Sequence, residues 1–90
     1  MRYTDFPPIN YFVRALKICP KSAYLYAQIW RKKDKHMKIL TEKDEIRKEF
    51  LISPTIFRNL LEPLMGLNLV RFKENDGTFR IDLSGPSTNE

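Results

Sequence analysis

The stretch that decides the fold of this chain runs from Thr41 to Leu83 and reads TEKDEIRKEFLISPTIFRNLLEPLMGLNLVRFKENDGTFRIDL. Its first part predicts a helix, because Thr41 opens an imperfect capping box and acidic residues crowd the first turn. A short turn at Leu51-Ile52 follows, and Ser53 then begins a second helix. The stretch ends in two alternating segments, so it predicts helix, turn, helix and β-ribbon in that order.

The second helix of this stretch has signals at both ends. Ser53 can cap its N-terminus, and Pro54 occupies the first helical position, where the missing N–H of proline would have no partner. Asn68 can adopt the left-handed conformation that ends a helix, and Pro63 should kink the helix. Apolar residues at spacings of three and four predict one buried face, made by Phe57, Leu60, Leu61 and Leu64.

The two alternating segments predict a β-hairpin. Val70–Lys73 and Thr78–Leu83 alternate apolar and polar residues around Asp76-Gly77, a pair typical of tight hairpin turns. Upstream, the short alternating segment Met37–Leu40 predicts a further strand against the hairpin.

The first part of the chain predicts two more helices. Apolar residues at helical spacing from Ile9 to Ile18 indicate a short amphipathic helix, which should end at Cys19-Pro20 because the residue before proline avoids helical angles. Ser22 can cap the next helix. The buried stripe of that helix is expected to contain Ala23, Tyr26, Ile29 and Trp30.

Length and composition indicate one small domain. Ninety residues, 42% of them hydrophobic, suffice for one core. We expect an extended arm at 1–8, a folded domain at 9–83 and a disordered tail at 84–90. No apolar run approaches the ~20 residues that span a bilayer, and no signal-peptide core is visible. These features predict a cytoplasmic protein with no membrane partner.

The charge is unevenly distributed. The net charge of +5 favours a polyanionic partner. Residues 1–40 hold nine Lys and Arg against two acids, whereas residues 41–90 hold seven against nine. The half that contains the helix, turn, helix and ribbon is therefore slightly acidic.

The order and spacing of these residues resemble winged helix-turn-helix domains of bacteria, plasmids and phages, particularly the N-terminal domains of plasmid replication initiators. The segment from Leu16 to Ile29 is similar to the one that opens such domains. The later helix and strand match at Ser53, Phe57, Leu61, Leu64, Leu69 and Val70. The resemblance covers about Leu16 to Leu83 and implies a mainly α fold with a small β-ribbon. It also implies that the helix after Ser53 enters the major groove of duplex DNA.

The resemblance implies a DNA-binding surface in two parts. Asn59 would pair with an adenine edge, Ile56 would touch a thymine methyl, and Arg58 would reach a phosphate or a guanine. The expected helix residues are Ser53, Thr55, Ile56, Arg58 and Asn59, and the expected phosphate contacts on the hairpin are Arg71, Lys73 and Arg80.

Four positions depart from the family pattern. Leu51 stands where the turn glycine usually lies, so we expect a looser turn. Ile56 replaces a threonine that usually meets a phosphate, and Pro54 and Asn59 stand where an arginine or serine often reaches DNA.

The leading hypothesis is sequence-specific binding of double-stranded DNA by a transcriptional regulator or replication accessory protein. Because specific sites usually need the area of two modules, a homodimer is expected, through segment 9–18 and the aromatic face of the following helix. The alternative is a protein–protein interaction adaptor or antirepressor, favoured by the apolar Ile56 and the acidic second half. A weaker third hypothesis is single-stranded nucleic acid or RNA binding through exposed tyrosines.

No enzyme, cofactor or metal site is expected. His36 is the single histidine and Cys19 the single cysteine, so the sequence offers no cluster of zinc-type ligands. A Cys19–His36 nucleophilic pair would lack any further orienting group.

Overall fold

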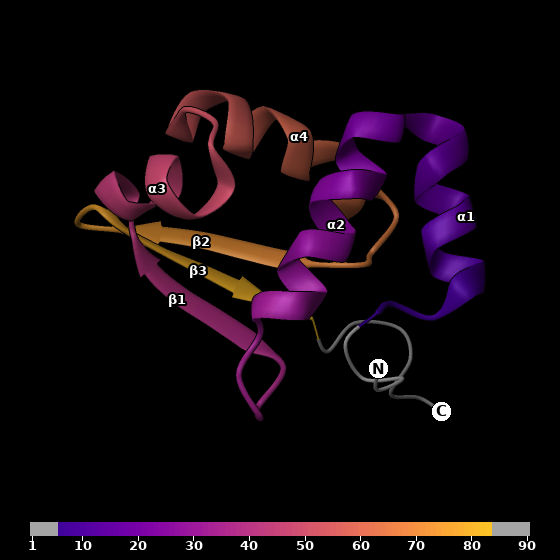
Figure 1. Cartoon of the computed structure of the whole chain (residues 1–90), viewed down its shortest axis with the longest axis horizontal. Coiled ribbons are helices and arrows are strands. Elements are labelled where there is room, and N and C mark those ends of the chain that lie inside the picture. The colour runs from indigo at the N-terminus through magenta and orange to yellow at the C-terminus, as the bar shows by residue number, and fades with distance from the viewer. Residues whose placement is uncertain (1–5, 84–90) are drawn as a thin grey trace.

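The computed structural model describes residues 6–83, so most of the expected arm and all of the expected tail at 84–90 lie outside the described residues. Four helices and a three-stranded antiparallel sheet make up this range (Figure 1). In chain order the elements are α1 (Ile9–Ile18), α2 (Pro20–Lys32), β1 (Lys38–Glu42), a 3₁₀ turn (Lys43–Glu45), α3 (Ile46–Phe50), α4 (Pro54–Gly66), β2 (Arg71–Asn75) and β3 (Thr78–Asp82).

The sheet has the order β1-β3-β2, with both edge strands antiparallel to β3. The predicted hairpin is confirmed. Asp76 and Gly77 form its turn with φ angles of 51° and 80°, the pair of positive φ values that a tight hairpin turn of this kind requires. The predicted strand at Met37–Leu40 is confirmed as β1, which begins one residue later.

The core lies between the helices and one face of the sheet. Phe57 of α4 stacks on Phe79 of β3, with ring centroids 5.9 Å apart, and Phe50 of α3 packs against Phe57 at 5.0 Å. Helices α3 and α4 lie on the same side of the sheet, and α1 lies beyond α2 (Figure 1). The predicted apolar faces are largely confirmed, since Phe57, Leu61, Leu64, Ala23, Tyr26, Ile29 and Trp30 are buried and Leu60 is half-buried.

Ser22 does not cap α2 as the sequence predicted. The helix begins three residues earlier than a Ser22 cap would place it, at Pro20, with Cys19 in the capping position. Ser22 is fully buried, and its hydroxyl donates to the carbonyl of Leu60 at 2.6 Å. A buried hydroxyl needs a hydrogen-bond partner, and this one finds it 38 residues away in α4.

The predicted helix start at Thr41 is also wrong. Thr41 lies in β1 opposite Phe79, and the pairing of β1 with β3 continues to Glu42. Strand pairing with β3 therefore overrides the local capping signal, and regular α-helix starts only at Ile46. Ile46 itself and Phe50 are buried.

The turn between α3 and α4 keeps the backbone of a glycine turn although Leu51 occupies it. Leu51 has φ 63° and ψ 26°, and its N–H donates to the carbonyl of Arg47 at 3.0 Å. Its side chain is 83% exposed. The expected looser turn is therefore replaced by a regular left-handed one.

Both predicted ends of α4 are confirmed. The Ser53 hydroxyl accepts a hydrogen bond from the N–H of Ile56 at 3.2 Å, and Pro54 is the first helical residue. At the other end Asn68 has φ 62°, and the N–H of Leu69 donates to the carbonyl of Leu64 at 2.9 Å. The helix includes Pro63 without interruption.

Candidate nucleic-acid interface

The first two turns of α4 present a stripe of polar and apolar side chains to solvent. Thr55 and Asn59 are exposed and four residues apart, so they lie on one face of the helix. Ile56 lies beside them with 48% of its surface exposed. Ser53 is half-buried, and its hydroxyl oxygen serves as the cap of the helix. The candidate residues of this stripe are therefore Thr55, Ile56 and Asn59.

Arg58 is held by an ion pair. Its Nη1 donates to Oε1 of Glu74 at 2.7 Å, which joins α4 to β2. The side chains are 42% and 29% exposed, so the pair lies partly out of water. The one cation among the candidate residues of α4 is thus already neutralised, and a phosphate would have to compete with Glu74 for it.

The three hairpin cations lie on the face of the sheet that the helices leave open. Side chains alternate between the two faces of a strand. Phe79 and Ile81 of β3 point into the core, so Arg80 points outward. Lys73 is directly opposite Arg80, and Arg71 is opposite Asp82.

These placements separate the predicted site into two surfaces. Arg71, Lys73 and Arg80 are brought together and, with Asp82, line a shallow hollow of about 200 Å³. They are not brought together with the stripe of α4, which packs on the opposite face of the sheet through Phe57. The sequence did contain a signal for this separation. The three cations occupy positions that alternate with the inward-facing residues of the hairpin, such as Phe79 and Ile81.

The ribbon adds little to the surface beside α4. Strand β1 pairs with β3 as far as Thr78, which is the first residue of β3, so the hairpin does not project beyond the sheet. The tip is tied down further, because the N–H of Lys43 donates to the carbonyl of Gly77 at 2.7 Å. Glu74 and Asp76 also make this end of the ribbon acidic.

Cations that the sequence reasoning did not select precede α4. Lys43, Arg47 and Lys48 are exposed in the 3₁₀ turn and α3. Lys48 forms a loose, exposed ion pair with Glu45 at 3.9 Å. Because α3 packs beside α4, Lys43 and Arg47 are the better candidates for phosphate contacts on this side of the sheet.

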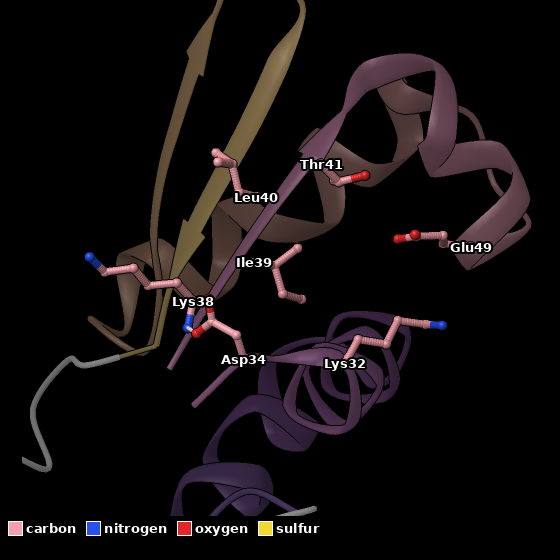
Figure 2. A pocket seen from close by; sticks show the side chains of 7 residues that line it. All are labelled: Lys32, Asp34, Lys38, Ile39, Leu40, Thr41 and Glu49. Carbon is pink, nitrogen blue, oxygen red and sulfur yellow. Dashed lines mark hydrogen bonds between the residues drawn. The ribbon is translucent and has the colours of Figure 1, made fainter. Parts of the chain in front are cut away.

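A second hollow, of about 400 Å³, opens between the end of α2, β1 and α3 (Figure 2). Ile39 and Thr41 face it from β1, while Lys32 and Glu49 reach toward it from the two helices (Figure 2). Its rim carries charges of both signs, including Asp34. This mixture creates no field of one sign that would concentrate a charged ligand.

Asp34 is part of the turn that leads into β1. One carboxylate oxygen accepts the N–H groups of His36 and Lys38 at 2.8 and 3.1 Å. Desolvation of the Asp34 carboxyl raises its pKa, but these two donors and the positive charges of both residues outweigh it, so the pKa lies below its ordinary value. The carboxylate has a structural role in this turn.

Cys19 and His36 do not form a nucleophilic pair. They lie beyond opposite ends of α2, whose 13 residues span about 20 Å. Within residues 6–83, no three His, Cys, Asp or Glu side chains gather as a metal site would need. None of the helices in the same range is long and apolar enough to cross a membrane.

The positions of the aromatic side chains in α2 do not favour the hypothesis of binding to single-stranded nucleic acid or RNA. Tyr26 and Trp30 are buried in the core, with rings edge-to-face 6.5 Å apart, whereas Tyr24 is 67% exposed. Tyr24 is thus the one exposed ring of α2, and a single ring there does not make a stacking surface for successive bases.

Comparisons of the chain with protein-family models, with curated proteins and with solved structures found no match.

Proposed function

We propose that the chain is a winged helix-turn-helix protein that binds double-stranded DNA sequence-specifically, with α4 as the recognition helix. The order α2, β1, α3, α4, β2, β3 and the sheet order β1-β3-β2 support this proposal. So does the tight, left-handed turn that joins α3 to α4.

The observation that carries the proposal is the exposed stripe of α4. Thr55 and Asn59 offer hydrogen-bonding groups, and Ile56 offers an apolar surface of the kind that meets a thymine methyl. An asparagine can pair in bidentate fashion with the edge of adenine in the major groove. The N-terminal end of a helix is also the part that contacts bases in most helix-turn-helix proteins.

Phosphate contacts on this side are assigned to Lys43 and Arg47, in place of the hairpin cations. With Arg58 joined to Glu74, the proposed interface has few charges of its own. Its binding therefore depends on base contacts more than on the phosphate charge. The proposal includes a cytoplasmic role as a transcriptional regulator or replication accessory protein.

A homodimer is part of the proposal, because one α4 offers few base contacts. The outward face of α1 carries Ile9, Val13 and Leu16, which are 66%, 38% and 43% exposed. Their spacing of four and three residues places them on one stripe, the arrangement by which helices pair. Two copies packed through this stripe would present two α4 helices.

The test is selection of preferred sites from a pool of random duplexes, followed by affinity measurements on the selected site. Asn59→Ala should weaken binding to that site by about 5–150-fold, the range expected when one bidentate base contact is lost. Asn10→Ala, the same change at an exposed position of α1, is the matched control and should leave affinity unchanged. Failure to enrich any sequence would contradict the proposal.

A protein-interaction adaptor is the second candidate, and two exposed apolar side chains favour it. Leu51 in the turn and Ile56 at the start of α4 are 83% and 48% exposed, next to a helix whose arginine is engaged in an ion pair. Such a surface suits a protein partner as well as a base edge. Backbone NMR spectra that show no change at α4 when duplex DNA is added would favour the adaptor.

A further inference from the structure

The outer face of the sheet carries two cations directly opposite each other on neighbouring strands. In the register of the strands, Leu40, Arg80 and Lys73 lie side by side across β1, β3 and β2. Cross-strand neighbours on one face of a sheet stand about 4.5–5.5 Å apart at Cβ, and like charges in such a pair destabilise the sheet. The Lys73–Arg80 pair therefore has a cost in the free protein that a bound anion would remove.

The neighbouring rows show that this arrangement is local. In one of them Asp82 lies between Lys38 and Arg71, so an acid separates two cations. In the other, Glu42, Thr78 and Asn75 carry one acid and no cation. The face as a whole holds four cations and two acids, and neither acid stands directly opposite Lys73 or Arg80.

We propose that this outer face is a second DNA-contact surface, which binds the phosphate backbone of a duplex through Arg71, Lys73 and Arg80 on the opposite side of the sheet from α4. The three side chains line one shallow hollow together with Asp82, so cations outnumber acids there by three to one. Long cations that neutralise phosphates gain affinity from counterion release without any contact to bases.

The composition of the face selects a duplex backbone over a single strand. Sheets that bind single strands stack bases on exposed aromatic rings. Within the described strands, the aromatic residues Phe72 and Phe79 belong to the inner face, and Phe79 is fully buried. The outward positions carry only charged, polar and aliphatic side chains, which suits contact with phosphates.

The experiment compares two double variants that remove the same charge. Lys73→Gln with Arg80→Gln removes the opposed pair, and Lys17→Gln with Arg31→Gln removes two exposed cations from α1 and α2. Affinity for a short random-sequence duplex is measured as a function of salt concentration. The logarithm of the association constant decreases linearly with the logarithm of the salt concentration. The steepness of this decrease should drop by about 1.8 for the sheet variant, at about 0.9 for each phosphate contact, and should stay unchanged for the helix variant.

A second measurement locates the contact. Addition of the same duplex should shift the backbone amide signals of 71–73 and 79–81, and these shifts should persist in Asn59→Ala. Equal slopes for the two double variants, or amide shifts confined to α4, would overturn the proposal. Tighter binding to vesicles of anionic lipid than to duplex DNA would overturn it as well, because the partner would then be a membrane surface.

This surface and the recognition helix succeed or fail separately. If Asn59→Ala loses the sequence preference but keeps the amide shifts in the strands, both α4 and the outer face of the sheet are supported as DNA-contact surfaces. Strand shifts without any selected sequence support the sheet surface alone and contradict the function proposed for α4.

Discussion

At the scale of single residues, Leu51 is one of two positions, with Met37, where a described residue with a long apolar side chain adopts a φ of 63°. A non-glycine residue in the left-handed region is disfavoured by about 1–2 kcal/mol, because its Cβ approaches the following carbonyl. Leu51 gains little in return, since its side chain is 83% exposed. The turn at Leu51 joins two helices that pack together through Phe50 and Phe57, whose ring centroids lie 5.0 Å apart.

Leu51→Gly should therefore stabilise the protein. We expect a gain of about 1 kcal/mol in the free energy of unfolding, since glycine adopts this conformation without steric cost. Chemical denaturation measures the gain. Leu51→Ala is the control, because alanine keeps the Cβ and should give no such gain. Equal stabilisation by both variants would show that the exposed leucine side chain, and not the backbone, is responsible.

Tyr26 gives a second prediction at this scale, in its pH dependence. Burial raises the pKa of Tyr26 to about 12, although the neighbouring Trp30 indole favours the ionised form and opposes the rise. Since the folded pKa lies above the ordinary value of about 10, the contribution of Tyr26 to stability is complete below pH 10. It is lost as the pH rises from about 10 to 12, when the unfolded chain ionises first.

Absorbance of tyrosinate checks this prediction. A component that appears only near pH 12, and that is missing in Tyr26→Phe, is the expected result. The variant should also lose stability less steeply between pH 10 and 12. Complete ionisation of every tyrosine by pH 11 in the folded protein would contradict the burial argument.

At the scale of elements, the sheet is the part in which stability and proposed binding oppose each other. Lys73 faces Arg80 in an unfavourable pair, whereas Arg71 faces Asp82 in a favourable one. Opposite charges across strands contribute about 0.2–1 kcal/mol, and like charges cost a similar amount. The same substitution at these two positions of β2 should therefore have opposite effects.

Lys73→Glu should raise the free energy of unfolding by a few tenths of a kcal/mol to about 1 kcal/mol, because it creates an ion pair with Arg80. Arg71→Glu, the matched control, should lower it, because the new carboxylate faces Asp82. Both variants should bind random duplex DNA more weakly. A Lys73→Glu protein that is less stable than wild type would show that the two side chains avoid each other in solution.

At the scale of the whole molecule, the folded domain has three surfaces of different character. The stripe of α4 lies on one side of the sheet, the opposed cations lie on the other, and the apolar stripe of α1 lies on the far side of α2. An apolar stripe on a helix that already packs its other face, through Ala15, points to a second buried contact. The dimer proposed above uses this stripe.

Val13→Glu should disrupt that dimer. A carboxylate placed in an apolar helix–helix contact would lose its hydration without gaining a partner. Sedimentation should change from the dimer to a 10.7 kDa monomer. Asn10→Glu introduces the same residue at an exposed position of α1 near its N-terminus and should leave the dimer intact. A wild-type protein that sediments only as a monomer at DNA-binding concentrations would contradict the dimer.

The sequence by itself determined the features that depend on neighbours within a few residues. The Ser53 cap, the left-handed Asn68 and the turn at Asp76-Gly77 are each stabilised by bonds or backbone angles inside one short segment. The apolar periodicity of α2 and α4 likewise fixed which sides of these helices are buried, because burial of one stripe is the main source of helix stability in a small domain.

Only the tertiary structure decided the features that depend on contacts between distant segments. Ser22 became a link to Leu60 instead of a cap, and Thr41 became part of a strand, because a partner across the fold competed with a weak local signal. Arg58 was joined to Glu74 from 16 residues away. The face on which Lys73 and Arg80 stand follows from which side of the sheet α4 covers, and that packing choice is made by the whole core.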